Sequence, residues 1–250
     1  MNPSSVFCGF RPAPVRRQAL RTLLAIAALI LLSVFVVFAQ PIPDTPLPAI
    51  RTTPSDGHGP WRSYDVTSGL TNNVVWALME DTTGTLWVGT FGGGVNTFDG
   101  QRWETFPQQT APANRLISAI AEDKKGVVWM GTLGGGVRRY DGQAWTSFTH
   151  ENGLASDRVR SMLLDRDGVL WVGTYGQGLS RYDGQQWRTF TKLDGLSGDI
   201  VYALVQDSTG AIWAGTDGKG LSRFDGQKWA PIPTPDGFVA NGVYALCPDS

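Results

Sequence analysis

The chain has 250 residues, of which 42% are hydrophobic and only 17% charged, so it has enough apolar material for a sizeable core. Its formal net charge is −1, but the four arginines before residue 40 meet no acid, and the rest of the chain carries 17 basic and 22 acidic residues. No basic stripe is present that could neutralise a nucleic-acid backbone, so we expect no nucleic-acid partner.

The first 60 residues form three segments of different composition. Residues 1–22 are basic and are expected to be cytoplasmic. Residues 23–39, LLAIAALILLSVFVVFA, are typical of the apolar region of a signal peptide, with Val37 and Ala39 as small residues before a cleavage position, but they are also just long enough to span a bilayer. This leaves a cleaved signal and an uncleaved inner-membrane anchor as alternatives, and both predict export of the chain after residue 39. Residues 40–60, rich in Pro and Thr, predict an extended linker.

Residues 61–250 are built from a repeat of 42 residues. The stretch LWVGTFGGGV at 86–95 returns three times, and two sets of tryptophans recur with it: Trp87, Trp129, Trp171 and Trp213 in the first set, and Trp103, Trp145, Trp187 and Trp229 in the second. Glycines after a strand can cradle a phosphate. A fourfold copy without a following Gly-Lys-Ser/Thr indicates a structural turn instead.

Each repeat predicts four short strands. In the first repeat they cover residues 74–81, 85–90, 95–98 and 101–106. Asp81 to Gly84 predicts the first turn, and Asp99-Gly100 is a strong hairpin signal between the third and fourth strands. Four short antiparallel strands every 42 residues are the signature of a β-propeller blade. We therefore predict an all-β fold, a β-propeller of four-stranded antiparallel blades, with the repeated tryptophans packed between blades.

Four complete repeats run from residue 73 to about 232. One outer strand at 61–64 is predicted to precede them, and one inner strand at 243–247 to follow them. The sequence thus predicts an incomplete propeller, an open arc whose exposed blade edges would favour self-association.

The repeat resembles the two-component regulator propeller repeat. The resemblance runs from Gly-Leu through Asp-x-x-Gly-x-Leu-Trp-Val-Gly-Thr-x-Gly-Gly-Gly-Val to the Asp-Gly hairpin, and it covers residues 61–250. The second repeat departs from it, with Ala111-Pro112 in place of Gly-Leu. The resemblance implies larger propellers, commonly seven-bladed, that form the periplasmic input part of histidine kinases or related regulators. Some of these propellers are thought to bind saccharides.

One face of the predicted propeller holds most of the variation among the repeats. In an up-and-down meander, the loops between blades share this face with the glycine loops. The variable positions there hold aromatic and polar residues that suit sugar rings, and they are the candidate ligand-binding residues: Trp76, Phe91, Arg160, Tyr175, Gln177, Tyr202, Asp217 and Lys219. The alternative is drift, because surface loops vary freely.

The most favoured function is an extracytoplasmic ligand-sensing propeller, with a small molecule or oligosaccharide as ligand. It would be the input portion of a signalling protein whose output domain lies outside these residues. A stand-alone exported binding or protein-interaction propeller is the alternative, and a polysaccharide-acting enzyme is a third hypothesis. His58 and His150 lie in loop-like sequence and form neither a triad nor a metal cluster, so no catalytic residue, metal or cofactor is expected. A membrane contact is expected only through residues 23–39, and only if this segment is not cleaved.

Overall fold

The computed structural model of the chain describes residues 62–106, 116–218, 220–233 and 242–247. The predicted basic, apolar and linker segments therefore lie outside the described residues, as does Trp61. The chain divides into two compact units, residues 1–68 and 69–250. The described part of the first unit contains one 3-10 turn, Val66–Ser68, where the Asp65 carboxylate accepts a hydrogen bond from the Thr67 amide at 2.8 Å. In the described part of the chain, no helix has the length and apolar character needed to cross a membrane.

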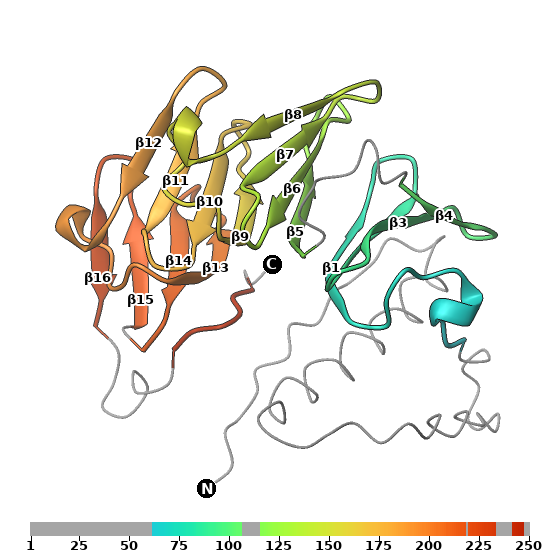
Figure 1. Cartoon of the computed structure of the whole chain (residues 1–250). Helices are drawn as coiled ribbons and strands as arrows, with labels where there is room; N and C mark the ends of the chain where they lie inside the picture. Colours follow the sequence, from blue (N-terminus) through green and yellow to red (C-terminus); the bar gives the residue numbers. More distant parts are fainter. Residues whose placement is uncertain (1–61, 107–115, 219, 234–241, 248–250) are drawn as a thin grey trace, which may run out of the picture. The chain divides into compact units, whose positions relative to one another are not determined.

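The second unit contains four antiparallel sheets, each made of four strands that follow one another in the chain (Figure 1). We call these sheets blades 1 to 4. Blade 1 consists of β1 (Val75–Glu80), β2 (Leu86–Thr90), β3 (Gly94–Phe98) and β4 (Trp103–Thr105). Blade 2 consists of β5 (Ile117–Glu122), β6 (Val128–Thr132), β7 (Val137–Tyr140) and β8 (Trp145–Phe148).

Blades 3 and 4 repeat this order. Blade 3 consists of β9 (Val159–Leu164), β10 (Leu170–Thr174), β11 (Leu179–Tyr182) and β12 (Trp187–Phe190). Blade 4 consists of β13 (Val201–Gln206), β14 (Ile212–Thr216), β15 (Gly220–Phe224) and β16 (Trp229–Ile232). The all-β propeller architecture predicted from the repeat is confirmed.

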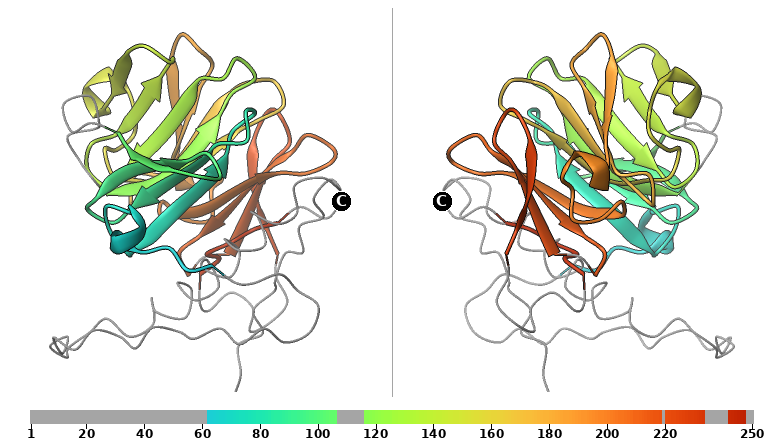
Figure 2. Two further views of the ribbon diagram at one scale, coloured as in Figure 1. Left: turned by 90° about the vertical axis from the view of Figure 1, so that its right-hand side faces the viewer. Right: turned by 90° about the vertical axis from the view of Figure 1, so that its left-hand side faces the viewer.

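The first strands of successive blades lie next to one another, in the order β1, β5, β9 and β13 (Figure 1). Two side views show each blade as a separate twisted sheet (Figure 2). We call β1, β5, β9 and β13 the inner strands. The second strands are the most enclosed, since β2, β6 and β10 are buried along their whole length.

The two predicted turns of each blade are present, and in both the aspartate side chain accepts backbone hydrogen bonds. In blade 1 the Asp81 carboxylate accepts from the amides of Thr83 and Thr85, both at 2.9 Å. The Asp99 carboxylate accepts from the amides of Gln101 at 2.8 Å and Arg102 at 2.7 Å. These Asx-type bonds explain why aspartate recurs at these positions, beyond its tolerance of turn conformations.

The first of these aspartates also holds a tryptophan of the next strand. The indole N–H groups of Trp87, Trp171 and Trp213 donate to the carboxylates six residues earlier, each at 2.8 Å. In blade 4 the hydroxyl of Thr209 and the indole of Trp213 hold the pKa of Asp207 well below its usual range. An ionised carboxylate therefore links the first turn to the second strand.

The glycine loop closes a hairpin between the second and third strands. The buried Thr90 hydroxyl donates to the Gly94 carbonyl at 3.0 Å, and the same bond recurs at Thr132, Thr174 and Thr216. Gly94 has φ +86°, a conformation that favours glycine. The loop leads into a strand, so the structural interpretation of the three glycines is confirmed.

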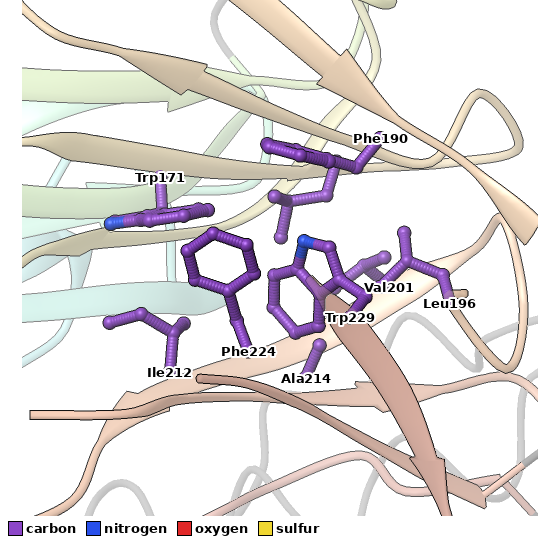
Figure 3. Packing of buried hydrophobic residues seen from close by; sticks show 9 residues of the cluster. Trp171, Phe190, Leu196, Val201, Ile212, Ala214, Phe224 and Trp229 are labelled. Atoms are coloured by element: carbon purple, nitrogen blue, oxygen red, sulfur yellow. The ribbon is translucent and has the colours of Figure 1, made fainter. Parts of the chain in front are cut away.

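Aromatic side chains fill the space between blades, as predicted for the tryptophans. Between blades 3 and 4, Trp171 and Phe190 meet Phe224 and Trp229, with ring centroids of Trp171 and Phe224 5.3 Å apart (Figure 3). Clusters of the same kind join blade 1 to blade 2 and blade 2 to blade 3. A four-stranded sheet that exposes two apolar faces thereby buries them against its neighbours.

One glycine in each second strand allows the next blade to approach closely. A Cβ atom on Gly89 would lie 2.5 Å from the Ile117 side chain, and one on Gly131 would lie 2.5 Å from Val159. Gly173 and Gly215 stand in the same relation to Val201 and Val243. The glycine of the repeated Gly-Thr pair is therefore a packing requirement between blades.

Two predicted strands are wrong. Residues 62–64 of the predicted outer strand 61–64 and residues 243–247 of the predicted inner strand have no strand structure. A strand needs a ladder partner, and no strand of the described residues pairs with either segment. Val243 nevertheless donates its amide to the Thr216 carbonyl at 3.0 Å, so the second segment follows the path of an inner strand without forming one.

Candidate ligand-binding site

Each inner strand contains a β-bulge at the same repeat position. In blade 1, Val75 pairs with Thr90 and Ala77 pairs with Gly89, so Trp76 is the extra residue. The register shifts in the same place in the other three blades, where the extra residues are Ser118, Arg160 and Tyr202. Bulges redirect a side chain and are frequent beside functional sites. The variable residue of each inner strand is thus the residue freed from the ladder.

The bulge residues of three blades meet at one place. The Arg160 guanidinium lies 5.5 Å from the Trp76 ring centroid and 5.3 Å from the Tyr202 ring centroid. Both distances are within the range of cation–π attraction. Ser118 comes between Trp76 and Arg160 in the order of blades, and its hydroxyl donates to the Val159 carbonyl at 2.7 Å. A residue this small leaves Arg160 the space to reach Trp76.

The residue after the Gly-Thr pair adds a second layer of side chains. The Phe91 amide donates to the Val74 carbonyl at 2.8 Å, which sets the Phe91 ring beside Trp76 with centroids 4.6 Å apart. At the same repeat position the Tyr175 ring lies 4.3 Å from the Arg158 guanidinium. Phe91 and Tyr175 are 41% and 40% exposed, so both rings offer surface to a ligand.

Tyr244 extends the group beyond blade 4. Its ring centroid lies 4.7 Å from that of Tyr202, and the side chain is 59% exposed. Partial burial raises the pKa of the Tyr202 hydroxyl, and the charge of Asp217 and the neighbouring hydroxyls of Tyr244 and Tyr175 raise it further. Asp217 and Tyr175 are therefore close enough to Tyr202 to influence the ionisation of its hydroxyl.

We call Trp76, Phe91, Arg160, Tyr202 and Tyr244 the bulge cluster. Four of its members are predicted candidates, and the structure brings them into contact. Two further candidates, Tyr175 and Asp217, lie near the cluster at Tyr202. Gln177 is exposed, and its backbone amide donates to the Thr174 hydroxyl at 3.3 Å. Lys219 lies outside the described residues.

The candidate set omitted Arg158 and Tyr244. Tyr244 stands one repeat length, 42 residues, after Tyr202, so the spacing places both at the same repeat position. Arg158 also departs from its repeat, because the equivalent positions hold Val74, Leu116 and Ile200, but only the fold brings it over Tyr175.

The bulge cluster offers aromatic surface and guanidinium donors, which are means of binding. No group of three or more His, Cys, Asp and Glu side chains that could hold a metal ion occurs within the described ranges. The described histidine, His150, begins the 3-10 turn His150–Asn152 between blades 2 and 3, and its Nδ1 pairs with Asp157 at 2.6 Å.

The family model of the two-component regulator propeller matches this chain four times, over residues 69–92, 112–134, 153–176 and 195–218. Each match starts before an inner strand and ends in the glycine loop. None of the curated proteins matches the sequence.

Three solved structures show the same fold. The extracellular domain of BT3049 from B. thetaiotaomicron, assigned as a hybrid two-component system, superposes with a TM-score of 0.54 and 25% identity, over 62% of this chain and 22% of that chain. The extracellular domain of BT4673 from the same organism, assigned as a one-component system, gives 0.52 and 22%, over 61% and 24%. A streptogramin B lyase gives 0.53 and 12%, over 69% and 58%. The chain spans about a quarter of the length of the first two structures.

Proposed function

Since the chain belongs to the two-component regulator propeller family, we propose that it is an exported ligand-sensing propeller, the input portion of a signal-transduction protein. The extracellular location of the BT3049 and BT4673 domains supports export. The positive flank before residue 23 is consistent with it.

The observation that carries the proposal is the convergence of the bulge residues from separate blades. Uniform packing between blades requires no variation at the bulge, yet this position holds Trp76, Ser118, Arg160 and Tyr202 in four otherwise similar blades. A ligand that contacts several blades at once would meet a different side chain from each. Variation of this kind serves recognition, because each blade supplies one contact of a composite site.

We propose a saccharide as the class of ligand. Phe91, Tyr175 and Tyr244 each present a partly exposed ring, and the apolar faces of sugar rings stack on such surfaces. The Arg158 and Arg160 guanidinium groups and the Asp217 carboxylate lie in the same region, where they can bond sugar hydroxyls.

The test is a screen of the purified chain against an oligosaccharide array, with hits measured by titration calorimetry. Substituting Trp76, Tyr175 or Tyr244 by alanine should weaken binding at least tenfold, about 1.4 kcal/mol. Leu193→Ala is the control, because Leu193 is 98% exposed in the 3-10 turn Lys192–Asp194, outside the bulge cluster. Binding that survives all three substitutions in folded variants would show that the site is neither the bulge cluster nor the adjoining Tyr175.

A further inference from the structure

Two arginines of the site, Arg158 and Arg160, pair with no carboxylate in the part of the chain that the structure describes. The ion pairs of the described residues involve other cations, such as Arg139 with Asp141 and Lys192 with Asp199. Arg158 and Arg160 instead lie against aromatic rings, which attract a cation but leave its charge uncancelled. The site therefore carries positive charge that is available to a ligand.

The two ring contacts also determine which atoms of Arg160 are available to a ligand. Trp76 and Tyr202 both lie near its guanidinium, at 5.5 and 5.3 Å from their ring centroids. The N–H donors of a guanidinium lie in its plane, and this planar fork matches the two oxygens of a carboxylate. Aromatic contacts hold the fork in position, so less entropy is lost when an anion binds.

The charge of the site differs from that of the surrounding protein. Residues after position 40 carry more acidic than basic residues, 22 against 17. Against this background, Arg160 in β9 and Arg158 just before it are a local feature, because neither pairs with a carboxylate among the described residues. Asp217 is the acid that acts on Tyr202, and one carboxylate does not balance two guanidinium groups.

We infer that the bulge cluster selects an acidic saccharide, one whose sugar rings carry carboxylates, such as a uronate oligosaccharide. This inference rests on the proposed function and specifies its ligand class. The sugar faces contact the exposed rings of Phe91 and Tyr244, and a ring carboxylate accepts hydrogen bonds from Arg160. Arg158, over Tyr175, would take a second carboxylate.

The experiment compares uronate oligosaccharides with their own methyl esters, which keep the shape and lose the charge. Titration calorimetry of the full chain should show at least tenfold tighter binding of one acid than of its ester. Arg160→Gln should remove most of this preference, and Arg160→Lys should retain part of it, because lysine keeps the charge without the planar fork. Arg102→Gln is the matched control, since Arg102 is a highly exposed side chain at the outer hairpin of blade 1.

The outcomes separate the two proposals. Equal binding of acid and ester, or an unchanged preference in a folded Arg160→Gln variant, overturns the acidic ligand and leaves saccharide binding intact. Failure of all acids and esters to bind, together with failure on the neutral array, overturns both proposals. Binding of acids that weakens as strongly in Arg102→Gln as in Arg160→Gln shows only a general charge effect and also overturns the inference.

Discussion

Blades 2 and 3 have the same four strands but pair their polar groups differently. In blade 3 the Trp171 indole donates to Asp165, and the buried Ser180 hydroxyl accepts the Ala155 amide at 2.9 Å. In blade 2 the indole nitrogen of Trp129 is buried with no hydrogen-bond partner among the described residues. The position of Ser180 is taken there by Arg138, which has no acceptor to offer.

The two blades nevertheless have the same ladder. Trp129 pairs with Arg139 and Ala121, and Trp171 pairs with Arg181 and Leu163, one repeat length on. The apolar strands, the glycines and the turn aspartates are therefore sufficient to specify a blade. The indole and serine hydrogen bonds add stability to a blade that is already specified.

The largest expected effect tests what the two blades share. Gly173→Ala places a Cβ atom directly against the Ser161 hydroxyl of the same blade and 2.8 Å from both the carbonyl oxygen and a methyl of Val201. The serine side chain can turn away, but the Val201 backbone cannot, so blades 3 and 4 must separate or shift. We expect a loss of about 3 kcal/mol in the free energy of unfolding, measured by urea denaturation. Gly131→Ala in blade 2 should cost a similar amount, because its Cβ would meet Val159.

The control for this prediction is Gly184→Ala. Gly184 has φ +96° but no neighbour within 4 Å, so alanine there meets strain without crowding and should cost about 1 kcal/mol. Gly173 has no positive φ, so a loss at Gly173 no larger than that at Gly184 would show that the approach of the next blade costs little and would contradict the prediction.

The next effect concerns the bond that blade 2 lacks. Trp171→Phe removes the donor to Asp165 and keeps an aromatic ring, whereas Trp129→Phe removes an indole N–H that has no described partner. We expect Trp171→Phe to lose about 2 kcal/mol more than Trp129→Phe, since hydrogen bonds to charged groups contribute about 1.5–3 kcal/mol. Thermal and urea unfolding of both variants measures this difference. A larger loss at Trp129 would mean that ring packing dominates and the Asp–Trp bond adds little.

The sequence could predict the skeleton of the blades and much less of the site. The 42-residue spacing of the tryptophans and the Asp-Gly pairs identified strands and turns, because these depend on local geometry and on a repeated apolar pattern. The β-bulge has no such signal. Strict alternation along β1 gives no reason for Trp76 to leave the ladder, and only pairing with β2 reveals it.

The site candidates show the same limit. Variation among repeats identified Arg160 and Tyr202, but their contact depends on the placement of separate blades. Gln177 was chosen by the same criterion, but its hydrogen bond within the described residues is made by the backbone amide to Thr174 and not by the side chain to the cluster. Variation indicates the face of the propeller, and the bulge decides which side chains on that face converge.

A smaller effect is expected at the position of Ser180. Ser180→Ala leaves the Ala155 amide without its acceptor, at a cost of about 1 kcal/mol. In blade 2, burial lowers the pKa of the Arg138 guanidinium, so this charge is poorly solvated. Arg138→Met keeps the apolar stem and should be neutral or stabilising. Urea denaturation of both variants measures the change in the free energy of unfolding. An equal loss in Arg138→Met and Ser180→Ala would contradict the prediction.

The smallest effect separates two equivalent loops by pH. His150 pairs with Asp157 after blade 2, and Lys192 pairs with Asp199 at 3.3 Å after blade 3, one repeat length later. The hydrogen bond from Asp157 and then its charge raise the pKa of His150. A raised folded-state pKa gives a stability contribution that is complete below the unfolded value of about 6.5 and is lost as the pH rises through the folded value.

The test is His150→Lys, which copies the loop after blade 3. Lysine stays charged across this range, so its pair with Asp157 should persist where the histidine has lost its proton. We expect the wild-type chain to lose a little stability above about pH 6.5 and the variant to lose none. The free energy of unfolding, measured from pH 5 to pH 9, checks this. Parallel pH profiles for the two proteins would mean that the His150–Asp157 pair, exposed as it is, contributes nothing to the stability of the loop.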